Sequence, residues 1–205
     1  MSEKKQMIKN ALILFAITLV AGVLLGMVYQ VTKAPIAYQE ELAQTKANQE
    51  VFPDAASFED VELDETQAES IISSDSSYSK VSVDSVKRAL DANGAELGYV
   101  LQITSGGYND DIVFTMGITD DCVLNGISLI SIAETPGLGM NAQKVIVPQF
   151  ASKTVSSLFE VTKQGATSDS QIEAISGATI TSKAVTNGVN AGLLYFQNVL
   201  GGGQS

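Results

Sequence analysis

The first part of the chain divides sharply by polarity. From Asn10 to Thr32, 23 residues carry no charged side chain. A helix of that length, rising about 1.5 Å per residue, can cross a hydrocarbon core of about 30 Å. A cleaved signal peptide has a shorter apolar core of about 7 to 15 residues and then a small-x-small cleavage pattern, which residues 33–35 fit poorly. A lipoprotein anchor needs a cysteine directly after the apolar run, and the only cysteine is Cys122. We therefore predict an uncleaved membrane-spanning helix.

Polarity changes again after this apolar run. Residues 36–50 predict a polar helix or stalk that follows Pro35. Residues 59–79 are acidic and serine-rich without a clear period, which predicts a loop. The domain organisation expected from these patterns is a cytoplasmic tail over 1–9, a transmembrane helix over 10–32, a stalk and acidic linker over 33–79, and a folded domain over 80–205.

The folded domain opens with a hairpin pattern. The segments "KVSVDSVKRAL" and "ELGYVLQITS" flank "DANGA", in which Asn93-Gly94 is a strong turn signal. The segments "DIVFTMGIT" and "VLNGISLISI" follow, separated by the tight turn "DDC". These patterns predict an antiparallel meander of about four strands, covered by a helix from about Asn141 to Phe159.

A second helix is expected after "SGATITS", before the terminal "GGGQS". Its apolar residues recur at helical spacing and form one stripe that should pack on the sheet. The stripe comprises Val185, Val189, Leu193, Phe196 and Leu200. The predicted fold class is α+β with one transmembrane helix.

Charge predicts an orientation and excludes some partners. The chain has a net charge of −11; three lysines and one glutamate give residues 1–9 a charge of +2, which leaves −13 for the remainder. The positive-inside bias places the amino terminus in the cytoplasm and everything after residue 33 outside. A domain this acidic argues against binding to nucleic acid or to anionic lipid surfaces. Within the apolar run, Thr18, Gly22, Gly26 and Gln30 form a stripe that another helix could approach, although glycine is common in membrane helices.

The chain offers few residues for redox or metal chemistry. It contains no histidine and a single cysteine, so it has no imidazole ligand, no histidine base, no cysteine set for an iron–sulfur cluster and no internal disulfide. Asp120 and Asp121 are typical of a turn, and Cys122 of an inert strand residue. We expect no metal site and no catalytic residue, so any electron chemistry needs an organic cofactor.

The stretch "SGATITS" at residues 176–182 supports two interpretations. Thr179, Thr181 and Ser182 stand where a hydroxyl can cap a helix by accepting from a first-turn amide. Alternatively, Ser176, Gly177 and Ala178 leave a backbone slim enough to enter another enzyme's active site, and a helix amino terminus beside it favours a phosphate. The residues alone leave both interpretations open.

The longer stretch "EAISGATITSKAV" resembles the flavinylation motif of the G subunit of the Rnf complex and of the related C subunit of the sodium-pumping NADH:quinone oxidoreductase. That motif has an aspartate, two variable residues, serine or threonine, glycine, alanine, and the acceptor. Residues 176–178 match it, Thr179 stands at the acceptor position, and Glu173 replaces the usual aspartate. The resemblance implies FMN joined through its phosphate to Thr179, transferred from FAD by a magnesium-dependent flavin transferase of the ApbE type. Thr181 and Ser182 are expected beside it.

A second match is "ETPGLG" at residues 134–139, which by itself predicts a turn. In the resembled family this loop lies against the flavin ring, and glycines permit close backbone approach. The resemblance implies cofactor contacts from Glu134, Thr135, Gly137, Leu138 and Gly139. The alternative for Glu134 is an ordinary solvated carboxylate. The segment "GGYNDDI" at 106–112 resembles the family's Gly-Tyr-Gly-Gly segment, with Asn109 and Asp110 in place of the last two glycines.

With "VFP" at 51–53 and the single span, the resemblance covers essentially the whole chain. It implies an electron-relay subunit with covalent FMN in a membrane complex that couples electron transfer between ferredoxin and NAD to sodium or proton movement. The implied partners are the other Rnf subunits, the flavin transferase and membrane lipid. The alternatives are the C subunit of the quinone-reducing complex, a stand-alone extracellular flavoprotein and a membrane-anchored signalling module.

Overall fold

The computed structural model describes residues 2–201, so all but the first residue of the terminal "GGGQS" lies outside the described part. Contacts between residues divide the chain into two units. One reaches from the amino terminus to Ala43, and the other begins at Gln44. Each unit is described by itself.

The first unit consists of most of one long helix. Helix α1 runs from Ser2 to Val51 and includes both the apolar run over 10–32 and the segment over 36–50, for which a polar helix or stalk was predicted. It continues through Pro35, although proline removes one backbone donor. The apolar side chains between Met7 and Leu42 are exposed. Among the described residues, α1 is the one helix that is long and apolar enough to cross a membrane.

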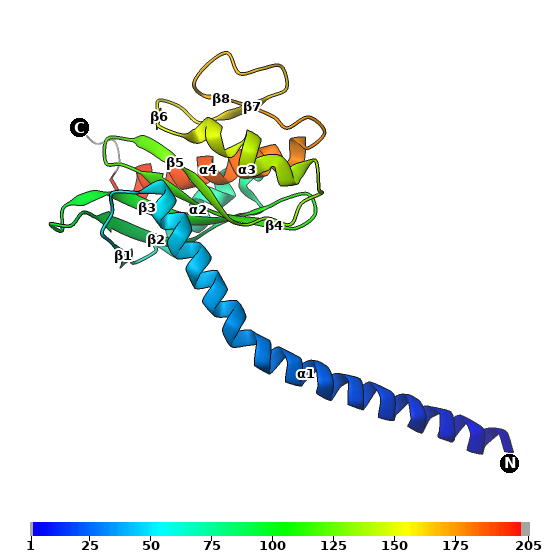
Figure 1. Ribbon diagram of the computed structural model, residues 1–205. Helices are drawn as coiled ribbons and strands as arrows, with labels where there is room; N and C mark the ends of the chain where they lie inside the picture. The colour runs from blue at the N-terminus through cyan, green and yellow to red at the C-terminus, as the bar shows by residue number, and fades with distance from the viewer. Residues whose placement is uncertain (1, 202–205) are drawn as a thin grey trace. The chain divides into compact units, whose positions relative to one another are not determined.

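The second unit is built on a six-stranded antiparallel sheet in the order β1-β2-β3-β4-β5-β6 (Figure 1). The predicted four-stranded meander is confirmed as its centre. In it, the β2–β3 hairpin turns at Gly94, which has a positive φ of 81°. The strands are β1 (Ser57–Val61), β2 (Val81–Leu90), β3 (Glu96–Gly106), β4 (Asp111–Ile118), β5 (Val123–Ser131) and β6 (Lys153–Thr154).

The loop predicted over 59–79 is wrong. Strand β1 pairs with β2, helix α2 occupies Glu65–Ser74, and a 3₁₀ turn follows at Ser76–Tyr78. Only two side chains of α2 are buried, so its sequence shows no clear period. Strand β1 is held by backbone pairing, which leaves little trace in side-chain polarity. Because the second unit begins at Gln44, residues 44–79 belong to it.

The helix predicted over 141–159 is also wrong. Helix α3 covers only Ala142–Val145, a 3₁₀ turn covers Val147–Phe150, and β6 then joins the edge of the sheet. Pro148 accounts for the early end, because proline lacks the backbone donor and disfavours the helical region in the residue before it. Cys122, predicted as a strand residue, instead lies in the β4–β5 turn with a φ of 58°.

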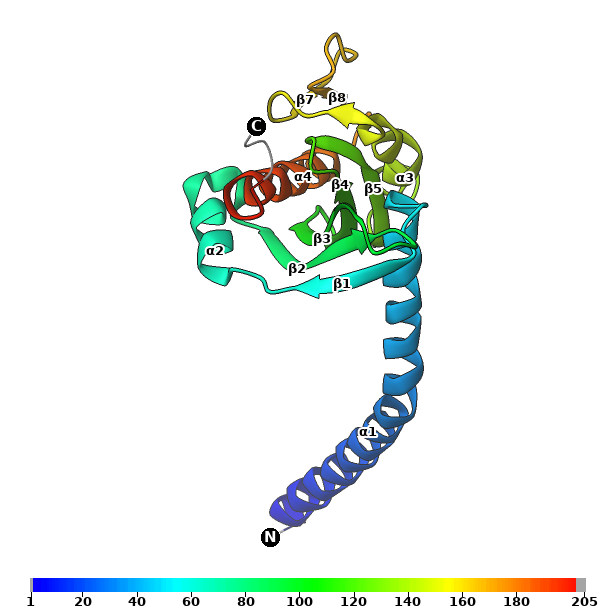
Figure 2. The same ribbon diagram turned by 90° about the vertical axis from the view of Figure 1, so that its left-hand side faces the viewer.

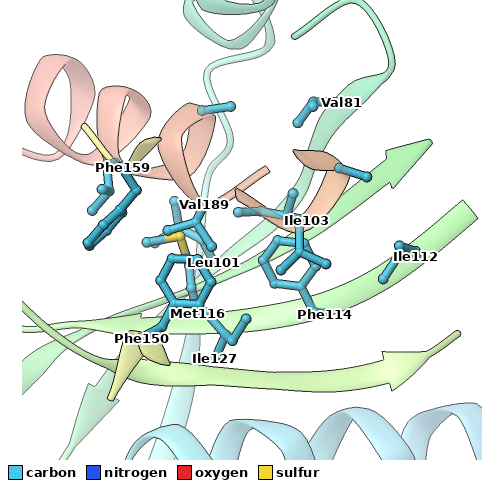
Figure 3. Close-up of a cluster of buried hydrophobic side chains, with 14 of the residues drawn as sticks. Val81, Leu101, Ile103, Ile112, Phe114, Met116, Ile127, Phe150, Phe159 and Val189 are labelled. Atoms are coloured by element: carbon cyan, nitrogen blue, oxygen red, sulfur yellow. The ribbon is translucent and has the colours of Figure 1, made fainter. Parts of the chain in front are cut away.

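The main core lies between the sheet and helix α4 (Thr179–Val199), which crosses one face of the sheet (Figure 2). Four residues of its predicted stripe are fully buried, and Leu200 lies partly buried at the helix end. Aromatic and aliphatic side chains interdigitate in this layer (Figure 3). They include Val81, Leu101, Ile103, Ile112, Phe114, Met116, Ile127, Phe150, Phe159 and Val189.

A smaller core covers the opposite face, where Val51 and Phe52 pack with Ala89 and Val100. A two-stranded parallel sheet, β7 (Glu160–Thr162) with β8 (Gln171–Glu173), leads into the loop before α4. The main core holds α4 against the strands, and these elements carry the site.

Candidate functional site

A cleft of about 480 Å³ opens where three segments of the second unit meet. The segments are the β3–β4 turn, the turn that follows β5, and the start of α4. This volume falls within the range of about 300 to 1,000 Å³ that is typical of small-molecule sites. The lining residues are Tyr108, Glu134, Thr135, Leu138, Gly139, Gly177, Ala178, Thr179, Ile180 and Thr181.

The structure therefore brings together most of the residues predicted from the sequence, although the two motifs are about forty residues apart. Ser176, Gly137 and Ser182 do not line the cleft. Two lining residues, Tyr108 and Ile180, were not among the predicted site residues. Tyr108 lies in "GGYNDDI", so that resemblance was the available signal; Ile180 carries none, because an isoleucine in a helix pattern predicts core.

Thr179 is the first residue of α4, and the helix-cap interpretation is wrong for it and for its neighbours. The cap residue of α4 is Ala178, and no side chain caps this helix end. Among the described residues, the Thr179 hydroxyl has no hydrogen-bond partner. It is half-buried and lines the cleft. A hydroxyl so placed is available to a reagent or ligand in the cleft.

The other two hydroxyls bind parts of the protein. Ser182 Oγ accepts from the Ile175 amide at 3.0 Å and donates to the Ala178 carbonyl at 2.9 Å. Thr181 Oγ1 donates to Glu134 Oε2 at 3.0 Å. Ser182 therefore closes the loop that precedes Thr179, and Thr181 ties α4 to the turn after β5.

Glu134 is a buried carboxylate, not a solvated one: 5% of the residue is exposed. Its Oε1 accepts from the backbone amides of Tyr108, at 2.7 Å, and Asn109, at 3.2 Å. Together with the Thr181 bond, these contacts join all three segments that form the cleft. One side chain thus fixes the relative positions of the cleft walls.

Glycine is required at several positions around the cleft, for different reasons. A Cβ at Gly139 would lie 2.7 Å from both Glu134 Cβ and Thr181 Oγ1, and a Cβ at Gly107 would lie 2.1 Å from Glu134 Oε1. These two glycines therefore make room for the carboxylate. Gly137 has open space around it but a φ of +77°, and Gly177 has a φ of +80°. At Gly139, contacts within the protein alone leave no room for a larger residue.

The start of α4 presents donors for an anion. Within the part of the chain that the structure describes, the amides of Thr179, Ile180 and Thr181 have no acceptor. Free first-turn amides and the helix dipole favour a phosphate group at such a position.

Apolar side chains surround the same cleft. Tyr108, Leu138 and Ile180 line it, each between 39% and 68% exposed, and Met140 in the adjoining turn is 42% exposed. Exposed apolar surface beside a cleft is typical of a ligand site. A set of anion donors next to an apolar slot fits a molecule such as FMN, which joins a phosphate to a planar aromatic ring. No group of three or more potential metal ligands occurs in residues 2–201.

Comparison with known proteins gives two family matches. Residues 107–194 match the FMN-binding domain, a segment that contains every predicted site residue, and residues 1–51 match the RnfG N-terminal region. In solved structures, the C subunit of the Na⁺-translocating NADH-quinone reductase from Parabacteroides distasonis aligns with a TM-score of 0.49 at 18% identity, over 79% of this chain and 94% of that one.

Curated relatives extend these matches over the whole chain. The G subunit of the Na⁺-translocating ferredoxin:NAD⁺ oxidoreductase complex of Acetobacterium woodii is 35% identical over 95% of this chain and 94% of its own. The G subunit of an ion-translocating oxidoreductase complex of Methanosarcina acetivorans is 30% identical over 95% and 97%. The G subunit of the proton-translocating complex of Clostridium ljungdahlii is 28% identical over 89% and 88%. The chain belongs to the G subunits of ion-translocating ferredoxin:NAD oxidoreductase complexes, and its second unit carries an FMN-binding domain.

Proposed function

We propose that this chain is the flavin-carrying electron relay of such a complex and that FMN is attached through its phosphate to Thr179. The observation that carries the proposal is the position of the Thr179 hydroxyl. It lines the cleft without a partner among the described residues, inside the segment that matches the FMN-binding domain. Membership of the G-subunit family favours this function over a stand-alone flavoprotein or a signalling module.

The attachment is a phosphoryl transfer with FAD as the donor. A bond forms between Thr179 Oγ and the phosphorus on the FMN side, the pyrophosphate bond breaks, and AMP leaves. The threonine proton passes to a base of the flavin transferase, which we infer to be of the magnesium-dependent ApbE type. The chain is a substrate in this step, and its loop supplies access because Ser176 and Gly177 are exposed and small.

A bound FMN would supply the electron chemistry, and the chain's own residues would hold and orient it. The first-turn amides of α4 would bind the phosphate, and Tyr108, Leu138 and Ile180 would contact the apolar ring. The phosphodiester keeps the cofactor at high effective concentration in its cleft, which prevents its loss to the medium.

Location follows from α1. We infer that α1 spans the membrane with its amino terminus in the cytoplasm, because Lys4, Lys5 and Lys9 precede the apolar run and an acidic chain follows it. The flavin-bearing unit is then extracytoplasmic and meets the other subunits there. Relatives are named for sodium and for proton translocation.

The attachment is tested with the full-length protein, FAD, magnesium and the transferase, followed by denaturing electrophoresis. The wild type should fluoresce, because only a covalent flavin survives unfolding. Thr179→Ala should be dark, and Thr179→Ser should retain some label because it keeps a hydroxyl. Thr167→Ala, an exposed threonine outside the cleft, is the matched control and should label fully. Label that persists in Thr179→Ala would move the acceptor elsewhere.

The relay role is tested in membrane vesicles that contain Thr179→Ala at normal complex content by immunoblot. Ferredoxin-driven NAD reduction and ion transport should fail together, because the chain offers no histidine or cysteine set to replace the flavin. Full coupled activity in the flavin-free variant would refute the relay role.

A further inference from the structure

We propose that Glu134 sets the reduction potential of the flavin by holding a negative charge in the wall of the cleft, an inference that rests on the proposed function. Three features of Glu134 support this inference: its burial, its hydrogen-bond partners and the space that neighbouring glycines leave for it. None of them depends on where the flavin ring lies within the cleft.

The charge of Glu134 is not neutralised by an ion pair. Three salt bridges occur among the described residues, Lys46–Glu50, Lys87–Asp60 and Arg88–Glu96, and none includes Glu134. All three of its partners are donors, and an ionised carboxylate accepts from all three. The group is therefore stabilised by dipoles, which leave its net charge in place.

The site is built to keep a carboxylate at this point. At both Gly107 and Gly139, any larger residue would place its Cβ against Glu134 atoms. The hydrogen bonds hold the side chain between the β3–β4 turn and α4. Because 5% of Glu134 is exposed, water screens its charge less than it would screen a surface carboxylate.

A fixed negative charge in the wall opposes reduction of a ring in the cleft. Uptake of two electrons and one proton from water adds one negative charge to the flavin, and that charge is repelled by Glu134. Two unit charges about 12 Å apart, at an effective dielectric constant of about 20, change an equilibrium about tenfold. Glu134 therefore lowers the reduction potential and makes the reduced flavin a stronger electron donor.

The test compares two substitutions that separate charge from shape. Glu134→Gln keeps the length of the side chain; its oxygen can still accept from the two amides, and its NH₂ can donate to Thr181. Glu134→Asp keeps the charge but shortens the reach. Full-length proteins are flavinylated in detergent, loading is verified by denaturing electrophoresis, and ring absorbance is titrated with dithionite against redox mediators at alkaline pH.

We expect Glu134→Gln to raise the midpoint potential by an amount equivalent to about a tenfold change in the ratio of reduced to oxidised flavin, or about 30 mV for a two-electron couple. Glu134→Asp keeps the charge but loses part of the hydrogen bonding, so its potential should rise less than that of Glu134→Gln. An unchanged or lowered potential in Glu134→Gln overturns the inference, and so does an equal rise in Glu134→Asp, because that result would assign the effect to geometry.

A second pair of variants provides a test if Glu134→Gln is not flavinylated. Thr135 also lines the cleft, so Thr135→Lys places a positive charge in the same wall, and Thr135→Gln is its uncharged control. The lysine variant should have the higher potential, and equal potentials overturn the inference. Failure of the wild type to take covalent flavin would instead contradict the proposed function, and the inference with it.

Discussion

Replacement of Ser182 by alanine should destabilise the folded unit through a single buried amide. Ser182 is fully buried in the first turns of α4. Its hydroxyl accepts from the Ile175 amide at 3.0 Å and donates to the Ala178 carbonyl at 2.9 Å. In the variant, that carbonyl still accepts from the amide of residue 182, at 3.0 Å in the wild type. The Ile175 amide, in contrast, loses its partner.

The size of the effect follows from that difference. A buried donor left without a partner costs about 1 to 3 kcal/mol, whereas the carbonyl contributes little to the loss. Alanine has a better helix propensity than serine, which offsets this loss by about 0.5 kcal/mol. The free energy of unfolding should therefore fall by about 0.5 to 2.5 kcal/mol. In a unit of this size, about 2 to 4 °C of melting temperature corresponds to each kcal/mol, so we expect a decrease of about 1 to 10 °C.

The assay is thermal unfolding of the full-length protein in detergent, followed by near-ultraviolet circular dichroism. Tyr78 and Tyr195 are buried in the second unit, so this signal reports its packing. Ser176→Ala, which removes an exposed hydroxyl from the same loop, is the matched control and should change the free energy by less than about 0.5 kcal/mol. A Ser182→Ala variant as stable as the wild type, or a control equally destabilised, would refute the reasoning.

Two further predictions concern packing and orientation. Gly192→Ala should lower the melting temperature in the same assay, by an amount equivalent to about 1 to 3 kcal/mol. The reason is that the added Cβ would lie 2.4 Å from Met116 Sδ and 2.6 Å from Ile103 Cδ1. A stabilised variant would show that helix propensity outweighs this contact. A periplasm-active reporter fused at the carboxyl terminus should be active and a cytoplasm-active one silent, and the reverse pattern would place the flavin-bearing unit in the cytoplasm.

Several parts of this protein are determined by local sequence. The apolar run of α1 is fixed by length and polarity, since few other structures accommodate 23 uncharged residues. The β2–β3 hairpin follows from Asn93-Gly94, because Gly94 supplies the positive φ that the turn requires. The stripe of α4 follows from spacing, because residues three and four apart share one face of a helix. Each signal lies within one continuous segment of the chain.

Other parts depend on contacts that a linear pattern does not contain. Strand β1 forms because its backbone pairs with β2. Helix α2 forms because two of its apolar side chains are buried in the core. The long helix expected over 141–159 gives way to β6, which pairs with β5. Edge pairing is a backbone property and is almost independent of side-chain polarity, which is why these segments were predicted incorrectly.

The site shows the same division. The sequence indicated the two motifs and the hydroxyls, but it could not choose between a helix cap and an acceptor. Tertiary structure decided against the cap, because Ser182 and Thr181 bind Ile175 and Glu134 while the Thr179 hydroxyl stays without a partner among the described residues and lines the cleft. It also turned Glu134 from a possible surface carboxylate into a buried one. The burial of Glu134 and its hydrogen bond to Thr181, 47 residues away in the sequence, depend on the packing of α4 on the sheet. Local sequence does not determine either of them.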